Sequence, residues 1–133
     1  MVCGSIGYGG IEKIRGLYTV LKEKGFDTIN HLLEKDMDYS HINDFRDKRK
    51  LSQAIVEHDL DCIDNADVLV VILNSPSYGT AMEMLIAKGK GKKIVLLAKD
   101  SVPTPWPIHF SDFIVRDEQE LFQLLHKFRQ QAQ

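Results

Sequence analysis

The sequence predicts an α/β fold in which helices cover both faces of a parallel sheet. Two apolar runs, DVLVVIL at 67–73 and KIVLLA at 93–98, are typical of strands buried on both faces. Segments with helical periodicity alternate with the strand candidates, as in consecutive βαβ units. A chain of 133 residues can bury a core but is short for two enzymatic domains, so we expect a single domain over residues 1–133.

The first third of the chain is expected to begin with a strand and an amphipathic helix. Residues 1–6 are apolar and lead into a glycine-rich loop, which favours a strand. Apolar residues at helical spacing predict a helix over 11–24, which Gly25 would end. Residues 26–30 are expected to form a short strand, and the charged segment 34–50 to lie at the surface.

The rest of the chain alternates helices and strands more regularly. Ser77 is well suited to cap the helix that follows the first buried run. We expect helices over 51–65, 77–89 and 118–128, strands over 67–73, 93–98 and 113–116, and a rigid proline-rich loop containing Trp106 over 101–107.

Five strands suit a flavodoxin-like, three-layer sandwich with strand order 2-1-3-4-5. In such sheets, ligands bind at the carboxyl ends of the strands, where the strand order changes direction. That point would lie between the first and third strands. It would bring together two small, hydroxyl-rich loops, residues 4–10 and 74–80, as the walls of a ligand site.

Composition excludes several classes of protein. The formal charge of −2 and a pI near 6.2 give no basic surface, so we expect neither nucleic acid nor an anionic membrane as partner. No apolar stretch is suitable for a membrane span, and no leader peptide is recognisable. Cys3 and Cys62 lie among apolar residues, which indicates buried thiols in a reducing compartment and hence a cytoplasmic protein.

Two acidic residues occupy unexpectedly apolar surroundings. Glu83 lies within AMEMLIA at 81–87, early in a helix, and a buried carboxylate there is costly unless it is paired or functional. Asp59 lies one turn from Ile55 and Ile63, on the apolar stripe of its helix. The alternatives are that Glu83 belongs to an exposed helix face and that Asp59 accepts a structural hydrogen bond.

The glycine-rich loop contains Gly4, Gly7, Gly9 and Gly10 but matches no complete phosphate-binding motif. Together with Ser5 and the following helix N-terminus it would still suit an anion, and the alternative is a tight strand-to-helix turn.

The histidines show no spacing typical of a metal site, so we expect no metal. His31, after the expected second strand, is placed to line a ligand pocket, although a surface or core role is the alternative.

Three segments in this order resemble the nucleoside 2-deoxyribosyltransferase superfamily. They are CGSI at 3–6 followed by Gly9-Gly10, EHDL at 57–60 with ADV at 66–68, and PSYGTAME at 76–83. The first and third are most similar to the 2′-deoxynucleoside 5′-phosphate N-hydrolases. The resemblance runs over most of the chain but is weak in residues 34–50 and after Ala98.

The resemblance implies a set of roles. The carboxylate of Glu83 would attack or stabilise the anomeric carbon of the sugar, and Asp59 would orient the sugar or transfer a proton. A carboxylate suits this task because N-glycosidic cleavage passes through an oxocarbenium-like state. The remaining candidates would bind substrate, with the glycine–serine loop and Ser77 holding the 5′-phosphate: Cys3, Gly4, Ser5, Ile6, Gly7, Tyr8, Gly9, Gly10, His31, Ser77 and Gly79.

The resemblance further implies an enzyme without cofactors, acting as a homodimer whose partner chain completes the site. The expected reaction is hydrolysis of deoxyribonucleoside 5′-monophosphates to free base and deoxyribose 5-phosphate. Exchange of bases on deoxynucleosides and non-catalytic, regulatory nucleotide binding are the alternatives.

The chain departs from the family pattern at three places. Gly7-Tyr8 stands where the phosphate-specific enzymes carry an arginine, a bidentate clamp for phosphate. Met1 replaces an aromatic residue of the pocket. A proline-rich region containing Thr104 and Trp106 replaces a serine that the partner chain would supply.

Overall fold

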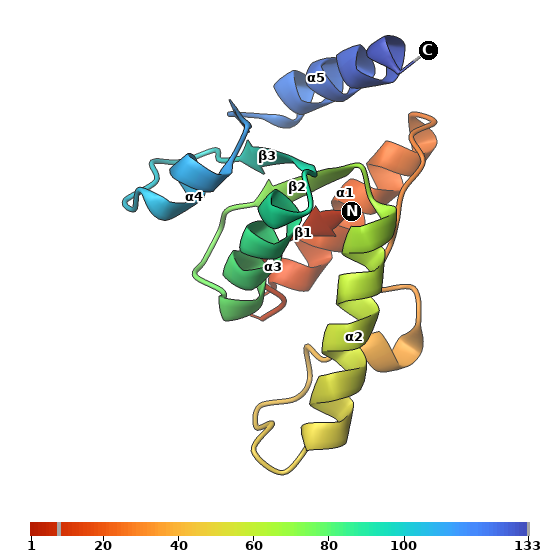
Figure 1. Cartoon of the computed structure of the whole chain (residues 1–133), viewed down its shortest axis with the longest axis vertical. Coiled ribbons are helices and arrows are strands. Elements are labelled where there is room, and N and C mark those ends of the chain that lie inside the picture. Colours follow the sequence, from red (N-terminus) through yellow and green to blue (C-terminus); the bar gives the residue numbers. More distant parts are fainter. Residues whose placement is uncertain (8, 133) are drawn as a thin grey trace.

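A four-stranded parallel sheet forms the centre of the molecule (Figure 1). The computed structural model describes residues 1–7 and 9–132, and for Lys35 the backbone alone. The strands follow one another across the sheet in chain order: β1 (Val2–Cys3), β2 (Val68–Ile72), β3 (Lys93–Leu97) and β4 (Phe113–Val115).

Helices cover both faces of this sheet, so the predicted three-layer α/β architecture is confirmed. Two apolar clusters define the faces, because alternate strand residues point to opposite sides. Val70 and Val95 pack with α1 (Gly10–Glu23) and α5 (Glu118–Gln131). On the other face, Leu69 and Ile94 pack with α2 (Arg49–Asn65) and α3 (Tyr78–Gly89).

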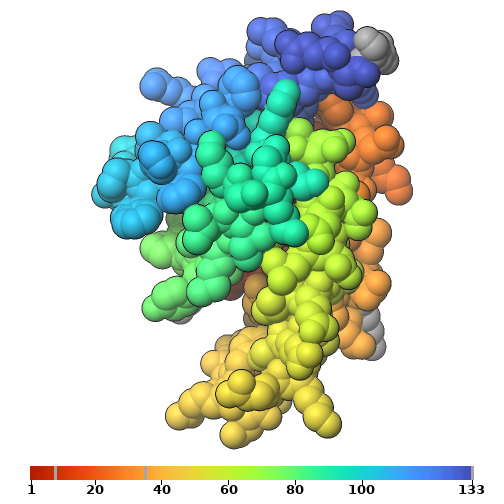
Figure 2. Space-filling view, viewed as in Figure 1, coloured from red at the N-terminus to blue at the C-terminus, as the bar shows by residue number. Residues whose placement is uncertain are grey.

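Two shorter elements complete the described chain. A 3₁₀ turn, η1 (Lys35–Met37), lies between α1 and α2 in the chain. The segment that follows it projects, together with the start of α2, from one end of the molecule (Figure 2). Helix α4 (Trp106–Phe110) packs against α3. None of the described helices combines the length and the apolar composition that crossing a bilayer requires.

The predicted fifth strand at 26–30, and with it the order 2-1-3-4-5, is wrong. The segment forms no strand, and the four observed strands keep the relative order expected without it. The side chain of Tyr18 explains the difference. Its hydroxyl accepts a hydrogen bond from the outward-facing N–H of Val2 (2.8 Å) and donates to the carbonyl of Ile29 (2.9 Å). Tyr18 therefore occupies the edge of β1 that a second strand would need.

The expected loop over 101–107 is also corrected, because α4 begins at Trp106 within it. Pro107 is tolerated there, since the first turn of a helix leaves its N–H groups without intrahelical partners.

Candidate active site

Helix α3 holds Glu83 on the flank that faces α2. The helix begins at Tyr78 because the Oγ of Ser77 accepts the N–H of Thr80 at 3.3 Å, an N-cap bond as predicted. Thr80, Met84 and Ala87 are the buried residues of α3. This packing fixes the rotation of the helix and leaves Glu83 half-buried beside Asp59 of α2.

The side chain of Cys3, which ends β1, also faces Glu83. Its Sγ lies 3.8 Å from Oε2 of Glu83, and the cysteine is 1% exposed. Burial, and after it the charge of Glu83, raise the pKa of the Cys3 thiol, so the sulfur keeps its proton and acts as a donor. The structure thus places Cys3 against the carboxylate.

The two carboxyl groups have different proton affinities. Burial and then the negative charge of Asp59 raise the pKa of Glu83 to about 8, while the hydrogen bond from Cys3 lowers it. Burial raises the pKa of Asp59 to about 6, although His58 lowers it. Pairs of carboxyl groups whose environments separate their pKa values are typical of sites that transfer protons and stabilise cationic carbon.

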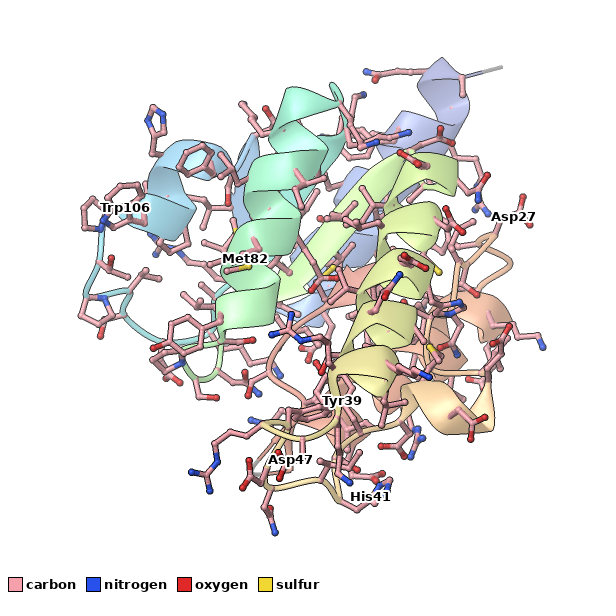
Figure 3. All side chains as sticks on the ribbon, turned by 60° about the horizontal axis from the view of Figure 1, so that its bottom comes forward. Asp27, Tyr39, His41, Asp47, Met82 and Trp106 are labelled. Carbon is pink, nitrogen blue, oxygen red and sulfur yellow. The ribbon has the colours of Figure 1, made fainter. Side chains whose placement is uncertain are left out.

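Tyr39 is a residue that sequence reasoning did not single out and that lies within range of the charges of Glu83 and Asp59. Burial, followed by the charges of Glu83 and Asp59, raises the pKa of its phenol to about 12. The ring packs edge-on against Phe45, with centroids 5.7 Å apart. Tyr39 lies in the segment that precedes α2 (Figure 3). Two aromatic residues within an otherwise charged segment were the available signal.

The glycine-rich loop folds closely on itself and on the neighbouring loop. A Cβ at Gly10 would lie 1.8 Å from the carbonyl oxygen of Ser5 and 3.4 Å from Nδ2 of Asn74. A Cβ at Gly4 would lie 3.2 Å from the carbonyl oxygen of Ile72. The loops 4–10 and 74–80 therefore meet, as predicted, although β1 is an edge strand and no reversal of strand order causes it.

The other loop residues take different positions. Ser5 and Ile6 are buried, and Gly9 has a left-handed φ of 80° as the N-cap of α1. A Cβ at Gly7 would meet no atom within 4 Å. A Cβ at Gly79 would lie 4.0 Å from the Oγ of Ser77, which is no closer than an ordinary contact. Tyr8 lies outside the described residues.

The structure gives His31 contacts within the core. Its Nδ1 lies 2.9 Å from the Tyr18 hydroxyl, its carbonyl oxygen lies 3.2 Å from Nε2 of His58, and burial lowers its pKa to about 4. His31 is therefore neutral and tied to α1 and α2, which supports the core alternative. Within residues 1–7 and 9–132, no group of three or more ligating side chains could hold a metal ion.

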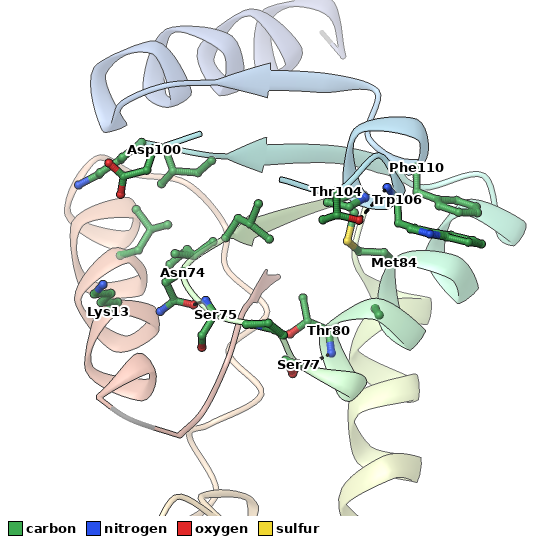
Figure 4. Close-up of a pocket in the computed structure, with 18 of the residues that line it drawn as sticks. Lys13, Asn74, Ser75, Ser77, Thr80, Met84, Asp100, Thr104, Trp106 and Phe110 are labelled. Carbon is green, nitrogen blue, oxygen red and sulfur yellow. Dashed lines mark hydrogen bonds between the residues drawn. The ribbon is translucent and has the colours of Figure 1, made fainter. Parts of the chain in front are cut away.

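A cavity of about 1190 Å³ lies between α1, α3 and α4 (Figure 4). Its walls are largely apolar, with Met84 and Trp106 among them. Lys13, Asn74 and Ser77 are among its polar lining residues. In the described chain Glu83 and Asp59 do not line this cavity, although Thr80, about one helical turn before Glu83, does.

Comparison with known proteins assigns a family to this arrangement. The sequence model described as nucleoside 2-deoxyribosyltransferase matches residues 10–125, which include Asp59, Ser77 and Glu83 but not the CGSI segment. No curated protein matches the chain. Because the match covers most of the chain, the protein belongs to the nucleoside 2-deoxyribosyltransferase family.

Proposed function

We propose that this chain hydrolyses the N-glycosidic bond of 2′-deoxyribonucleoside 5′-monophosphates, giving free base and deoxyribose 5-phosphate. The observation that carries the proposal is the half-buried carboxylate pair, Glu83 and Asp59, within a chain of this family. An ionised carboxylate beside the anomeric carbon stabilises the positive charge that develops there as the base departs.

In the proposed reaction, one oxygen of the Glu83 carboxylate forms a bond to C1′ while the bond from C1′ to the base nitrogen breaks. The base leaves with the electron pair and takes a proton, which Asp59 or solvent supplies. Water then attacks C1′ and loses a proton, so that the ester bond breaks and the Glu83 carboxylate is regenerated. No cofactor takes part in the proposed steps.

The 5′-phosphate would bind where the glycine-rich loop meets the N-terminus of α3. Ser77 caps that terminus, and the N–H groups of the first helical turn favour an anion. Lys13 lines the same cavity as Ser77 and is a cation that could replace the missing arginine. We propose that Ser77 and Lys13 together determine the preference for a phosphate over a free 5′-hydroxyl.

Transfer of the deoxyribosyl group to a second base is the second candidate. The description of the matching family supports it directly. Both reactions share the glycosyl-enzyme intermediate and differ in whether water or a base attacks C1′.

We further propose that the active form is a homodimer whose partner completes the site. Exposed apolar side chains recur on one flank of α3, at Tyr78, Met82 and Leu85, and continue to Trp106 of α4. Figure 3 shows Met82 and Trp106 on neighbouring helices. Contiguous apolar surface of this kind is typical of protein interfaces.

The test is incubation of the purified chain with a panel of deoxynucleoside monophosphates and deoxynucleosides, following free base by chromatography. Hydrolysis predicts release of base from the monophosphates without an acceptor. Transfer predicts release only when a second base is present. Tight nucleotide binding with no release from any substrate would identify a binding protein and overturn both catalytic proposals.

Variants assign the roles within this assay. Glu83→Gln should lower kcat by about a thousandfold or more, because the amide cannot form the ester. Asp59→Asn should lower kcat by about ten- to a hundredfold. Lys13→Ala should raise KM for monophosphates and leave KM for deoxynucleosides nearly unchanged. Full activity in Glu83→Gln would refute the catalytic assignment.

A further inference from the structure

We propose that Cys3 is a positioning residue whose thiol holds one oxygen of the Glu83 carboxylate, Oε2, and leaves the other oxygen free to meet the sugar. The inference rests on the proposed function, because it gives the geometry of the nucleophile in that reaction. It assigns Cys3 to the carboxylate, whereas the sequence motif alone placed it with the loop that holds substrate.

The backbone fixes the sulfur in place. Cys3 is paired with Val71 in the sheet, and its side chain belongs to the apolar cluster that packs under α2 and α3. Gly4, the next residue, lies so close to Ile72 that an added Cβ would be 3.2 Å from the carbonyl oxygen of Ile72. Both contacts are with β2, so the backbone of Cys3 is fixed against that strand, and its Sγ lies 3.8 Å from Oε2 of Glu83.

The surroundings make Cys3 a donor and Glu83 an acceptor. The groups that act on the Glu83 carboxylate are Asp59 from α2 and Cys3 from β1, and Tyr39 from the segment before α2 lies within reach of its charge. Within the described residues, the hydrogen bond to this carboxylate comes from Cys3. Because Asp59 repels an ionised Glu83, a donor on Oε2 favours both the orientation and the charged form.

The experiment compares Cys3→Ala and Cys3→Ser with the wild type across pH. We expect Cys3→Ala to lower kcat by about tenfold and to move the acidic limb of kcat/KM to higher pH, since the ionised form of Glu83 loses a donor. Cys3→Ser keeps a donor at nearly the same position and should restore most of kcat and the position of the limb.

Cys62→Ala is the matched control. Cys62 is the other free cysteine, is also buried in the same apolar cluster, and contacts His58. A merely structural role for Cys3 predicts the same result in both alanine variants: lower thermal stability with an unmoved acidic limb. That result would overturn the inference while leaving the proposed reaction intact.

A second readout does not need catalysis. Carboxyl carbons of [¹³C]glutamate-labelled protein can be titrated by NMR, with Glu83→Gln identifying the resonance of Glu83. We expect the midpoint of Glu83 to rise in Cys3→Ala and not in Cys62→Ala. An unchanged midpoint of Glu83 in Cys3→Ala would refute the hydrogen bond, whether or not the wild type releases base. If the midpoint rises but the wild type releases no base, only the proposed reaction is refuted.

Discussion

The carboxyl group of Glu83 couples the stability of the fold to pH. Its pKa is 4.5 when exposed and about 8 in the folded chain, so the folded state binds a proton that the unfolded state has lost between these values. The stabilisation that comes from the higher proton affinity of Glu83 in the folded state is complete below pH 4.5 and is lost as pH rises to about 8. At a pH where the Glu83 carboxylate is ionised and can act as the nucleophile, the folded state therefore carries the cost of burying its charge.

We therefore predict that Glu83→Gln stabilises the protein at pH 8, by on the order of 1–2 kcal/mol, and much less at pH 5. His31 acts in the opposite direction, because burial lowers its pKa from 6.5 to about 4 and its contribution is lost as pH falls through that range. Urea unfolding of wild type and variant at several pH values separates the two, since only the difference between the curves reports Glu83. A constant difference from pH 5 to pH 8 would contradict the prediction.

Two glycines of α1, Gly10 and Gly16, differ in how much space an added side chain would find. A Cβ at Gly10 would stand 1.8 Å from the backbone oxygen of Ser5, whereas one at Gly16 would meet nothing within 4 Å. Gly10→Ala should displace the glycine-rich loop and destabilise the fold by about 3 kcal/mol or more, a value typical of severe overpacking. Gly16→Ala should stabilise α1 by about 0.5–1 kcal/mol. Thermal unfolding measures both, and similar melting temperatures would show that the loop can yield at Gly10.

At the scale of elements, strands that are defined by apolar packing can be predicted from the sequence. A segment whose conformation depends on hydrogen bonds from one side chain cannot. Strands β2 and β3 are buried on both faces, so their apolar runs suffice to predict them. Residues 26–30 lack such a run and predict only a short strand. The hydroxyl of Tyr18, however, bonds both to β1 and to this segment, and no sequence pattern indicates that a helix side chain will reach the sheet edge.

The candidate site divides in the same way. Glu83 and Asp59 are visible because carboxylates interrupt apolar helix patterns. Cys3 was found through the motif, but its contact with Glu83 depends on how α3 is rotated over β1. Tyr39 was missed because its segment has the charge expected of an exposed surface, and only the fold brings it near the carboxylates.

Tyr18→Phe tests the role of the hydroxyl at the edge of β1. The variant keeps the ring but leaves the N–H of Val2 and the carbonyl of Ile29 without this partner in a buried region. We expect a loss of about 1–3 kcal/mol in the free energy of unfolding. Tyr78→Phe is the control, because Tyr78 is 89% exposed and should change stability by less than about 0.5 kcal/mol. Equal small effects would show that water replaces the Tyr18 hydroxyl at the edge.

In the molecule as a whole, helix α3 carries both the candidate catalytic residue Glu83 and part of the proposed dimer interface. Glu83 lies beside Asp59 of α2, and other residues of α3, among them Ala81 and Leu85, line the large apolar cavity together with Trp106 of α4. Ser77 lies at the N-terminus of the same helix and also lines the cavity. A partner chain that packs on α3 and α4 would therefore cover the cavity next to the proposed phosphate site without approaching from the side of α2.

This arrangement predicts that a charge on the apolar flank of α3 disrupts both association and catalysis. Leu85 lines the cavity and is 57% exposed, and Leu85→Glu should convert a dimer into monomers because it buries unpaired charges at the interface. Val56→Glu is the control, since Val56 is 55% exposed on α2, outside this flank.

Analytical ultracentrifugation measures the oligomeric state, and base release measures activity. We expect Leu85→Glu to be monomeric with kcat/KM lowered by about tenfold or more, because the partner no longer completes the site, and Val56→Glu to remain dimeric. A fully active Leu85→Glu monomer would show that one chain forms the whole site, and a wild type that is monomeric at all concentrations would refute the dimer itself.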